Sequence, residues 1–136
     1  MNGRSYFGKL ALASVVIIFV AVVLFAGKTE AQEAGGISIP DENLEAAIRD
    51  ALEKQGGDIT EEDMASLDGT LDASGRDIQD LTGLEHATNL SLLILNDNQI
   101  SDIEPLSSLT NLSWLILSYN QISDIGPLVA NEGISD

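Results

Sequence analysis

Residues 90–111 read LSLLILNDNQISDIEPLSSLTN, and residues 112–133 read LSWLILSYNQISDIGPLVANEG. At an offset of 22 residues the two stretches are identical at 13 of 22 positions. The mismatches fall mainly where a coil would face solvent or pass to its outer side. A constant period of this length predicts a solenoid, in which successive coils stack on one another.

The spacing L-x-x-L-x-L-x-x-N-x-I-x-x-I-x-x-L gives each position a role. In the short extended stretch, Leu93 and Leu95 are expected to point inward and their neighbours outward, because side chains alternate along a strand. Asn98 then turns the chain, since a buried carboxamide can bond backbone groups that a bend leaves unpaired. The return arm is filled by Ile100, Ile103 and Leu106. One coil cannot bury its own apolar edge, so neighbours must stack.

A degenerate third copy precedes these two, at residues 68–89. It has Arg76 at the Asn position and Gly83 at the Pro position. Such departures are expected of a terminal repeat, because one of its sides meets something other than a repeat.

The motifs N-Q-I-S-D-I-x-P-L and L-T-N-L resemble the 22-residue leucine-rich repeats of internalin-like bacterial surface proteins. The segment at residues 39–89, with IPDENLEAAIRDAL and GGDITEEDMASL, is similar to the helical amino-terminal cap of such proteins. The resemblance covers roughly residues 37–128. It implies an α/β solenoid with a short parallel β-ladder on a concave face and a helical cap, here preceded by an amino-terminal hydrophobic helix. It implies no particular ligand, because function belongs to sites and not to folds.

The cap segment itself predicts two helices. The first opens at Pro40 and ends at Gly56 and Gly57, with acidic residues in its first turns. Its apolar stripe comprises Leu44, Ala47, Ile48, Ala51 and Leu52. A second, shorter helix follows Thr60, which forms a capping-box pair with Asp63. Both helices have one apolar side, so we expect them to cover the first coil.

The predicted division of the chain starts with a signal peptide or signal anchor at residues 1–31. A linker at 32–38, the helical cap at 39–67 and the repeats at 68–131 follow, the repeats falling approximately at 68–89, 90–111 and 112–133. Residues 10–26 are uncharged and lie behind a basic start, which predicts export. Cleavage after Ala31 and retention as an anchor both remain open, because the run just reaches spanning length.

The tail at residues 132–136 carries no apolar cap. The core edge of the last coil is therefore expected to be bare. Either the chain is a fragment of a longer repeat protein, which we favour because solenoids need both ends closed, or this edge pairs with another surface.

The formal net charge is −16, and from Gln32 onward 21 acids face 3 bases. This charge predicts no nucleic-acid partner and no attraction to anionic lipid. One explanation of this acidity is that it keeps an exported solenoid soluble. The alternative explanation is an acidic face suited to a basic partner or to cations. The absence of cysteine excludes disulfides, thiolate zinc sites and a catalytic thiol.

The outward strand positions are the candidate binding residues. They are Thr70, Asp72 and Ser74, then Leu92, Ile94 and Asn96, then Trp114, Ile116 and Ser118. Among them we predict apolar partner contacts from Leu92, Ile94, Trp114 and Ile116, with Tyr119 alongside, and polar contacts from Asp72, Asn96 and Ser118. Clustered exposed apolar residues mark partner surfaces, and Trp and Tyr are common anchors. Alternatively, the Leu and Ile side chains stabilise only the strands.

Other candidate sites have weaker support. Asp80, Asp102 and Asp124 recur in one column, where capping of each turn is expected and calcium is the alternative. His86 stands alone, which predicts a surface or cap contact and no metal site. Ser74 has no neighbouring His, and neither has Ser118, so no nucleophile is activated. We therefore expect no enzyme activity, no cofactor and no metal.

These observations predict an extracytoplasmic protein-binding module, secreted or anchored to the cytoplasmic membrane with the repeats outside. Its partner is a protein of unknown identity, and the membrane is a further partner if the amino-terminal segment is retained. The alternative is a structural cap or spacer of a larger surface protein.

Overall fold

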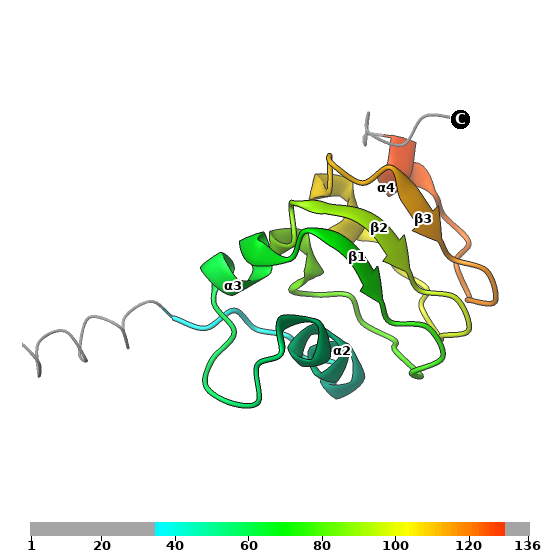
Figure 1. Ribbon diagram of the computed structural model, residues 1–136. Coiled ribbons are helices and arrows are strands. Elements are labelled where there is room, and N and C mark those ends of the chain that lie inside the picture. Colours follow the sequence, from blue (N-terminus) through cyan, green and yellow to red (C-terminus); the bar gives the residue numbers. More distant parts are fainter. Residues whose placement is uncertain (1–34, 130–136) are drawn as a thin grey trace, which may run out of the picture. The chain divides into compact units, whose positions relative to one another are not determined.

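The computed structural model describes residues 35–129 (Figure 1). Two helices come first, α2 (Glu42–Leu52) and α3 (Glu61–Ser66). Three short strands then alternate with short helical segments. These are β1 (Gly69–Asp72), η1 (Leu84–His86), β2 (Leu90–Ile94), η2 (Glu104–Ser108), β3 (Trp114–Ile116) and α4 (Gly126–Val129).

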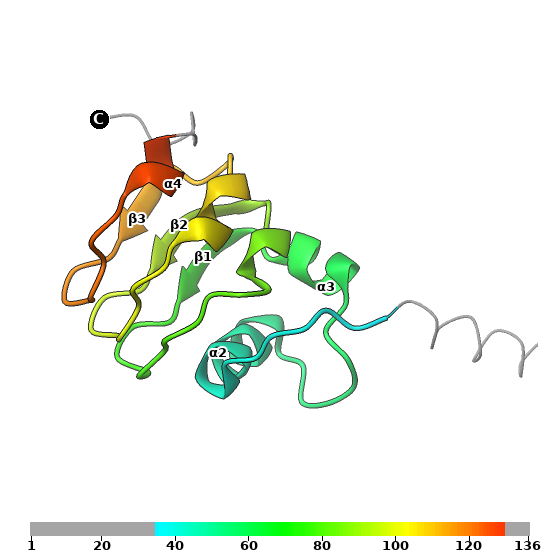
Figure 2. The same ribbon diagram turned by 180° about the vertical axis from the view of Figure 1, so that it is seen from behind.

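The strands form one parallel sheet in the order β1-β2-β3. Leu71, Leu93 and Leu115 are aligned across it, one from each strand. After each strand the chain turns and returns along the opposite side of the coil through η1, η2 or α4 (Figure 2). Strand, turn and return arm thus repeat with the predicted period, and the solenoid with a parallel ladder is confirmed.

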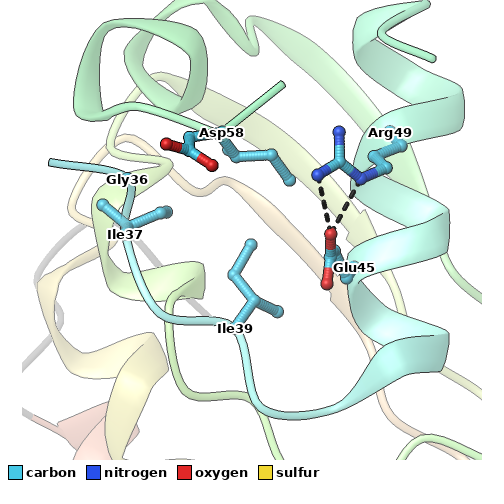
Figure 3. A pocket seen from close by; sticks show the side chains of 7 residues that line it. Gly36, Ile37, Ile39, Glu45, Arg49 and Asp58 are labelled. Carbon is cyan, nitrogen blue, oxygen red and sulfur yellow. Dashed lines mark hydrogen bonds and ion pairs between the residues drawn. The ribbon is translucent and has the colours of Figure 1, made fainter. Parts of the chain in front are cut away.

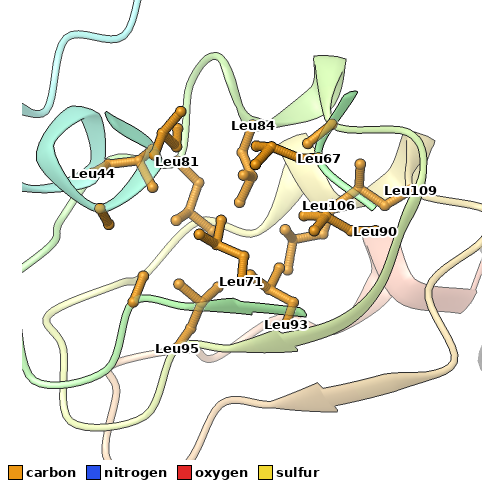
Figure 4. Close-up of a cluster of buried hydrophobic side chains, with 14 of the residues drawn as sticks. Leu44, Leu67, Leu71, Leu81, Leu84, Leu90, Leu93, Leu95, Leu106 and Leu109 are labelled. Carbon is orange, nitrogen blue, oxygen red and sulfur yellow. The ribbon is translucent and has the colours of Figure 1, made fainter. Parts of the chain in front are cut away.

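The core runs without a break through the stacked coils (Figure 4). Leu93 and Leu95 are fully buried, as predicted from the alternation along the strand. The equivalent positions of the first two coils are buried together. These pairs are Leu71 with Leu93, Ile78 with Ile100, Leu81 with Ile103 and Leu84 with Leu106. Each such side chain contributes about 1.5–3 kcal/mol by leaving water, so stacking is the main source of stability.

Asparagine side chains tie the turns of the second and third coils to the coil before each. The side-chain oxygen of Asn98 accepts hydrogen bonds from Arg76 N and Ile78 N, both at 3.0 Å. Its amide nitrogen donates to Ala73 O at 2.9 Å and Leu95 O at 3.0 Å. The predicted role of the Asn in turning the chain is therefore confirmed, and one side chain serves backbone groups of two coils.

Asn120 repeats this arrangement one coil later. Its oxygen accepts from Ile100 N at 3.0 Å, and its amide donates to Leu95 O at 2.8 Å and Leu117 O at 3.0 Å. In the first coil the same position holds Arg76, whose guanidinium instead forms an ion pair with Asp50 of the cap at 3.0 Å. The atypical residue of the terminal repeat thus contacts the cap.

Asp41 joins the first helix to the first coil. One carboxylate oxygen caps α2 by accepting from Asn43 N and Leu44 N at 3.0 and 3.1 Å. The other accepts from Gln79 N at 2.8 Å and Asp80 N at 3.1 Å in the first coil. Burial opposes ionisation of Asp41, but these four bonds outweigh it and hold its pKa below the ordinary value.

The far end of α2 differs from the prediction. The helix ends at Leu52, not at Gly56 and Gly57, because Glu53 adopts a left-handed conformation with φ of 53°. The following N–H groups then close the last turn, Glu53 N on Asp50 O at 3.2 Å and Lys54 N on Arg49 O at 3.0 Å. A non-glycine residue in this conformation gives little sequence signal.

The buried stripe of α2 is also shorter than predicted. Leu44, Ala47 and Ile48 are buried, whereas Leu52 is half-buried and Ala51 is exposed. Alanine is favourable at buried and at exposed helix positions alike, so its spacing in the sequence could not show that Ala51 is exposed.

The second helix begins as expected. The capping box of Thr60 and Asp63 is present, with Asp63 N donating to Thr60 Oγ1 at 3.2 Å and Thr60 N to Asp63 Oδ2 at 2.8 Å. Lys54 Nζ lies 2.6 Å from the same Asp63 oxygen. This ion pair fastens the loop between the helices to the start of α3.

The last coil is less covered than the others. Leu115, Leu117, Ile122 and Leu128 are only partly buried, although their counterparts one coil earlier are fully buried. Ile125 is 63% exposed and Val129 is 80% exposed. Within residues 35–129, therefore, the core edge of the last coil is open, as expected from the sequence.

No helix within residues 35–129 is long and apolar enough to cross a membrane. The predicted leader at residues 1–31 and the tail at 132–136 lie outside the described residues.

Candidate partner-binding surface

The predicted apolar contacts come together on the side of the sheet that points away from the core. Leu92 pairs with Trp114 and Ile94 with Ile116 in the parallel register, so the four side chains form two adjacent rows across β2 and β3. We call these four residues the apolar ladder. Trp114 is 70% exposed and Ile116 is 41% exposed, while Leu92 and Ile94 are partly buried. The predicted register is correct, and Trp114 points away from the core.

Tyr119 follows β3 at the turn of the last coil and is 81% exposed. Its φ is +58°, a left-handed conformation that is rare for a bulky residue. Gly75 and Asp97 occupy the same turn position in the earlier coils, with φ of +62° and +58°. Glycine and aspartate tolerate this conformation better than tyrosine does. The strain at Tyr119 therefore accompanies an exposed ring beside the ladder.

Polar residues border the ladder on the side of β1. Asp72 is aligned with Ile94 and accepts hydrogen bonds from Ser74 Oγ at 2.7 Å and Ser74 N at 3.1 Å. The Ser74 hydroxyl is the main cause that lowers the pKa of Asp72 below its ordinary value, so this carboxylate stays charged. It stands as a fixed negative charge next to apolar side chains.

The two other predicted polar contacts lie after β2 and β3. The Asn96 side chain is half-buried and donates to the carboxylate of Asp97. Ser118 is exposed, and its carbonyl accepts from Asp97 N at 3.0 Å. The predicted site residues thus lie on one continuous strip of the sheet and its turns.

A shallow hollow of about 520 Å³ adjoins the Trp114 ring. It is lined by Leu92 and by three hydroxyl residues, Thr70, Ser91 and Ser113. Ser91 and Ser113 were not among the predicted contacts. Each directly precedes an outward position of the ladder, so the alternation of side chains along the strand predicted no partner contact for it. Both nevertheless line the hollow, because they lie where β2 and β3 begin.

A second cavity, of about 260 Å³, lies in the cap (Figure 3). Arg49 faces it and is held by Glu45 at 2.8 Å and by Gly57 O at 3.0 Å. The remaining lining is Gly36, Ile37, Ile39, Asp58 and Ile59. Ile37 N donates to Ile59 O at 2.8 Å, so the chain before α2 closes over this region. We interpret these contacts as structural, because the arginine already has a carboxylate partner.

The aspartate column caps turns, as expected. Asp80 accepts from Thr82 N at 2.8 Å, Asp102 from Glu104 N at 2.9 Å and Asp124 from Gly126 N at 2.8 Å. Each carboxylate therefore bonds the backbone two residues ahead. Within the described residues, no three His, Asp or Glu side chains are grouped so as to hold a metal ion.

His86 is half-buried and contacts the cap, as predicted. Its Nδ1 lies 3.8 Å from a carboxylate oxygen of Glu61 in α3, and its Nε2 lies 3.9 Å from one of Glu85. The histidine therefore belongs to the packing between the cap and the first coil.

Stacked coils with a parallel ladder, asparagine-bonded turns and a helical cap define a leucine-rich repeat module. Among solved structures, the chain is similar to the internalin InlF of Listeria monocytogenes, with 37% identity and a TM-score of 0.67 over 71% of this chain and 28% of that one. Internalin C2 of the same organism gives 31% identity and a TM-score of 0.67, over 71% and 43% of the two chains. InlJ, whose functional domain includes a cysteine ladder, gives 33% and 0.64, over 71% and 21%.

The protein is therefore an internalin-like bacterial leucine-rich repeat protein. It spans less than half the length of each of these internalin structures. No protein-family model and no curated protein matches the chain. The likeness to internalins supports the prediction of a recognition module and not an enzyme.

Proposed function

We propose that the protein is an extracytoplasmic recognition module that binds a protein partner through the apolar ladder, with Tyr119, Asp72, Asn96 and Ser118 as surrounding contacts. The observation that carries this proposal is the exposure of Trp114, Ile116 and Tyr119 on one strip along the sheet and the turn that follows it. Rigid aromatic side chains clustered in this way commonly anchor protein interfaces.

The scaffold favours binding because it holds these side chains in place. The ladder residues stand on hydrogen-bonded strands, and the turns beyond them are fixed by Asn98 and Asn120. Little backbone freedom would be lost on association, which reduces the entropic cost of binding. The strained Tyr119 turn supports the same proposal, since unfavourable backbone conformations concentrate at functional positions.

Export and attachment belong to the same proposal. The apolar run at residues 10–26 supports transfer of the repeats out of the cytoplasm, with the leader either removed or retained in the cytoplasmic membrane. A leader of this kind would place the strand face where extracellular or envelope proteins can reach it.

A structural role is the second candidate. The open core edge at Ile125 and Val129 favours a module that caps a longer array of coils or stands as a spacer beside another domain. In that case the edge, and not the ladder, would make the important contacts.

One capture experiment separates the two roles. Envelope proteins retained by the wild-type chain are compared with those retained by Trp114→Ser combined with Ile116→Ser. The matched control, Ile125→Ser with Val129→Ser, removes a similar exposed apolar area from the open edge. Recognition through the ladder predicts loss of specific partners with the first pair only. Partners lost with the second pair alone would favour the structural role.

A further inference from the structure

We propose that the partner bound by the apolar ladder presents lysine or arginine beside its apolar residues, so that a cationic protein surface is the occupant of this face. The inference rests on the proposed function and adds the chemistry of the partner. It is carried by the placement of acids and bases around the ladder.

The bases of the described residues are all engaged at the cap. Arg49 binds Glu45 at 2.8 Å, Lys54 binds Asp63 at 2.6 Å and Arg76 binds Asp50 at 3.0 Å. After Arg76 the sequence contains no further lysine or arginine. The second and third coils, which carry the ladder, therefore have no lysine or arginine of their own.

Acids, in contrast, lie beside the ladder and in the turns that follow its strands. Asp72 is the register neighbour of Ile94, and Asp97 bonds the backbone of Ser118, next to Tyr119. Asp77 lies at the turn after β1, where it accepts from Gln99 Nε2 at 3.1 Å. We call Asp72, Asp77 and Asp97 the acidic edge. Asp72 ends β1, and Asp77 and Asp97 lie in the turns that follow β1 and β2.

Covering the ladder would withdraw water from this edge. One oxygen of Asp72 is bound by Ser74, and no hydrogen bond within the described residues uses the other. Arg76 is close enough to lower the pKa of Asp72 but is already bound to Asp50. A carboxylate that loses water without gaining a donor or a cation is strongly unfavourable. A partner that covers Ile94 together with Trp114 and Ile116 is therefore favoured when it brings a positive charge to Asp72.

The same charges disfavour other partners. An anionic surface would be repelled, and a bare divalent cation would find no group of three ligands in the described part of the chain. The acidity of the coils then has a use beyond solubility, because it speeds association with a basic partner and selects against acidic ones.

The test selects random linear peptides displayed on phage against the purified 136-residue chain. Peptides retained by the wild type but not by Trp114→Ser with Ile116→Ser are sequenced and synthesised. Trp114 is the only tryptophan, so fluorescence of the chain follows tryptophan-free peptides at this site. We expect the ladder-dependent peptides to carry net positive charge and to bind more weakly as salt is raised.

Asp72→Asn combined with Asp97→Asn then removes charge while keeping shape, since asparagine tolerates the left-handed turn at position 97. We expect this pair to weaken binding about fivefold. Glu62→Gln with Glu104→Gln, the control for net charge on α3 and η2, should change it little. The proposal of a cationic partner is wrong if the ladder-dependent peptides are neutral or acidic, or if their binding is unchanged by Asp72→Asn with Asp97→Asn. Either result would leave the proposed function intact. If no peptide depends on Trp114 and Ile116, the binding surface itself is refuted.

Discussion

Among the polar side chains, Asn98 is the one whose removal should lower the free energy of unfolding most. Asn98→Ala deprives Ile78 N and Arg76 N of their acceptor and Ala73 O of a donor. Leu95 O keeps a partner, because Asn120 also donates to it at 2.8 Å. An orphaned buried group costs about 1–3 kcal/mol, and Ile78 is fully buried. We therefore expect Asn98→Ala to lower the free energy of unfolding by about 3–4 kcal/mol.

The assay is urea denaturation followed by circular dichroism, because the exposed Trp114 is a poor reporter of unfolding. Asn111→Ala is the matched control. Its side chain is exposed and donates one hydrogen bond, to Thr88 O at 2.8 Å, so about 0.5 kcal/mol is expected. A small domain has a low free energy of unfolding, so the loss expected for Asn98→Ala would be a large fraction of it. If Asn98→Ala costs no more than Asn111→Ala, the argument that these asparagines hold adjacent coils together is wrong.

Three further predictions concern single residues. Lys54 and other donors lower the pKa of Asp63 to about 2 from 3.8. The ionised Asp63 therefore adds its full stability above about pH 4, and this stability is lost as the pH falls toward 2. Because the ion pair of Lys54 and Asp63 is partly solvated, we expect it to add about 1 kcal/mol, and Asp63→Asn should flatten this part of the pH–stability curve. Asp41→Ala should cost about 2–3 kcal/mol in urea denaturation, because four backbone N–H groups lose their acceptor, whereas Asp41→Asn, which keeps one oxygen, should cost less. Tyr119→Asn should raise the free energy of unfolding by about 0.5–1 kcal/mol, seen as a higher urea midpoint, because asparagine tolerates positive φ. The same change should weaken partner binding, and an unchanged or lower midpoint would contradict the assigned strain.

The repeat period determined most of what could be predicted. Because positions 22 residues apart are equivalent, the inward side of Leu93, the outward side of Trp114 and the pairing of Leu92 with Trp114 all followed from one alignment. The capping box at Thr60 was recognisable because its side-chain bonds are local in sequence.

Features that depend on long-range contacts or on unusual backbone conformations were not predictable. The end of α2 was misplaced because Glu53, a residue without a glycine signal, takes the left-handed conformation. The double use of Asp41, which reaches Gln79 and Asp80, joins residues far apart in the sequence. The strain at Tyr119 could have been suspected, since Gly75 and Asp97 stand in the same column.

The most direct test of the stacked-coil account compares two neighbouring residues on opposite faces of β2. Leu93 is fully buried, whereas Leu92 belongs to the partly exposed ladder. Urea denaturation should show that Leu93→Asp abolishes cooperative folding, because an unpaired charge enters the core. Leu92→Asp should stay folded, with a loss of about 1 kcal/mol. Equal losses for the two variants, or a larger loss for Leu92→Asp, would contradict the assignment of the buried and exposed faces.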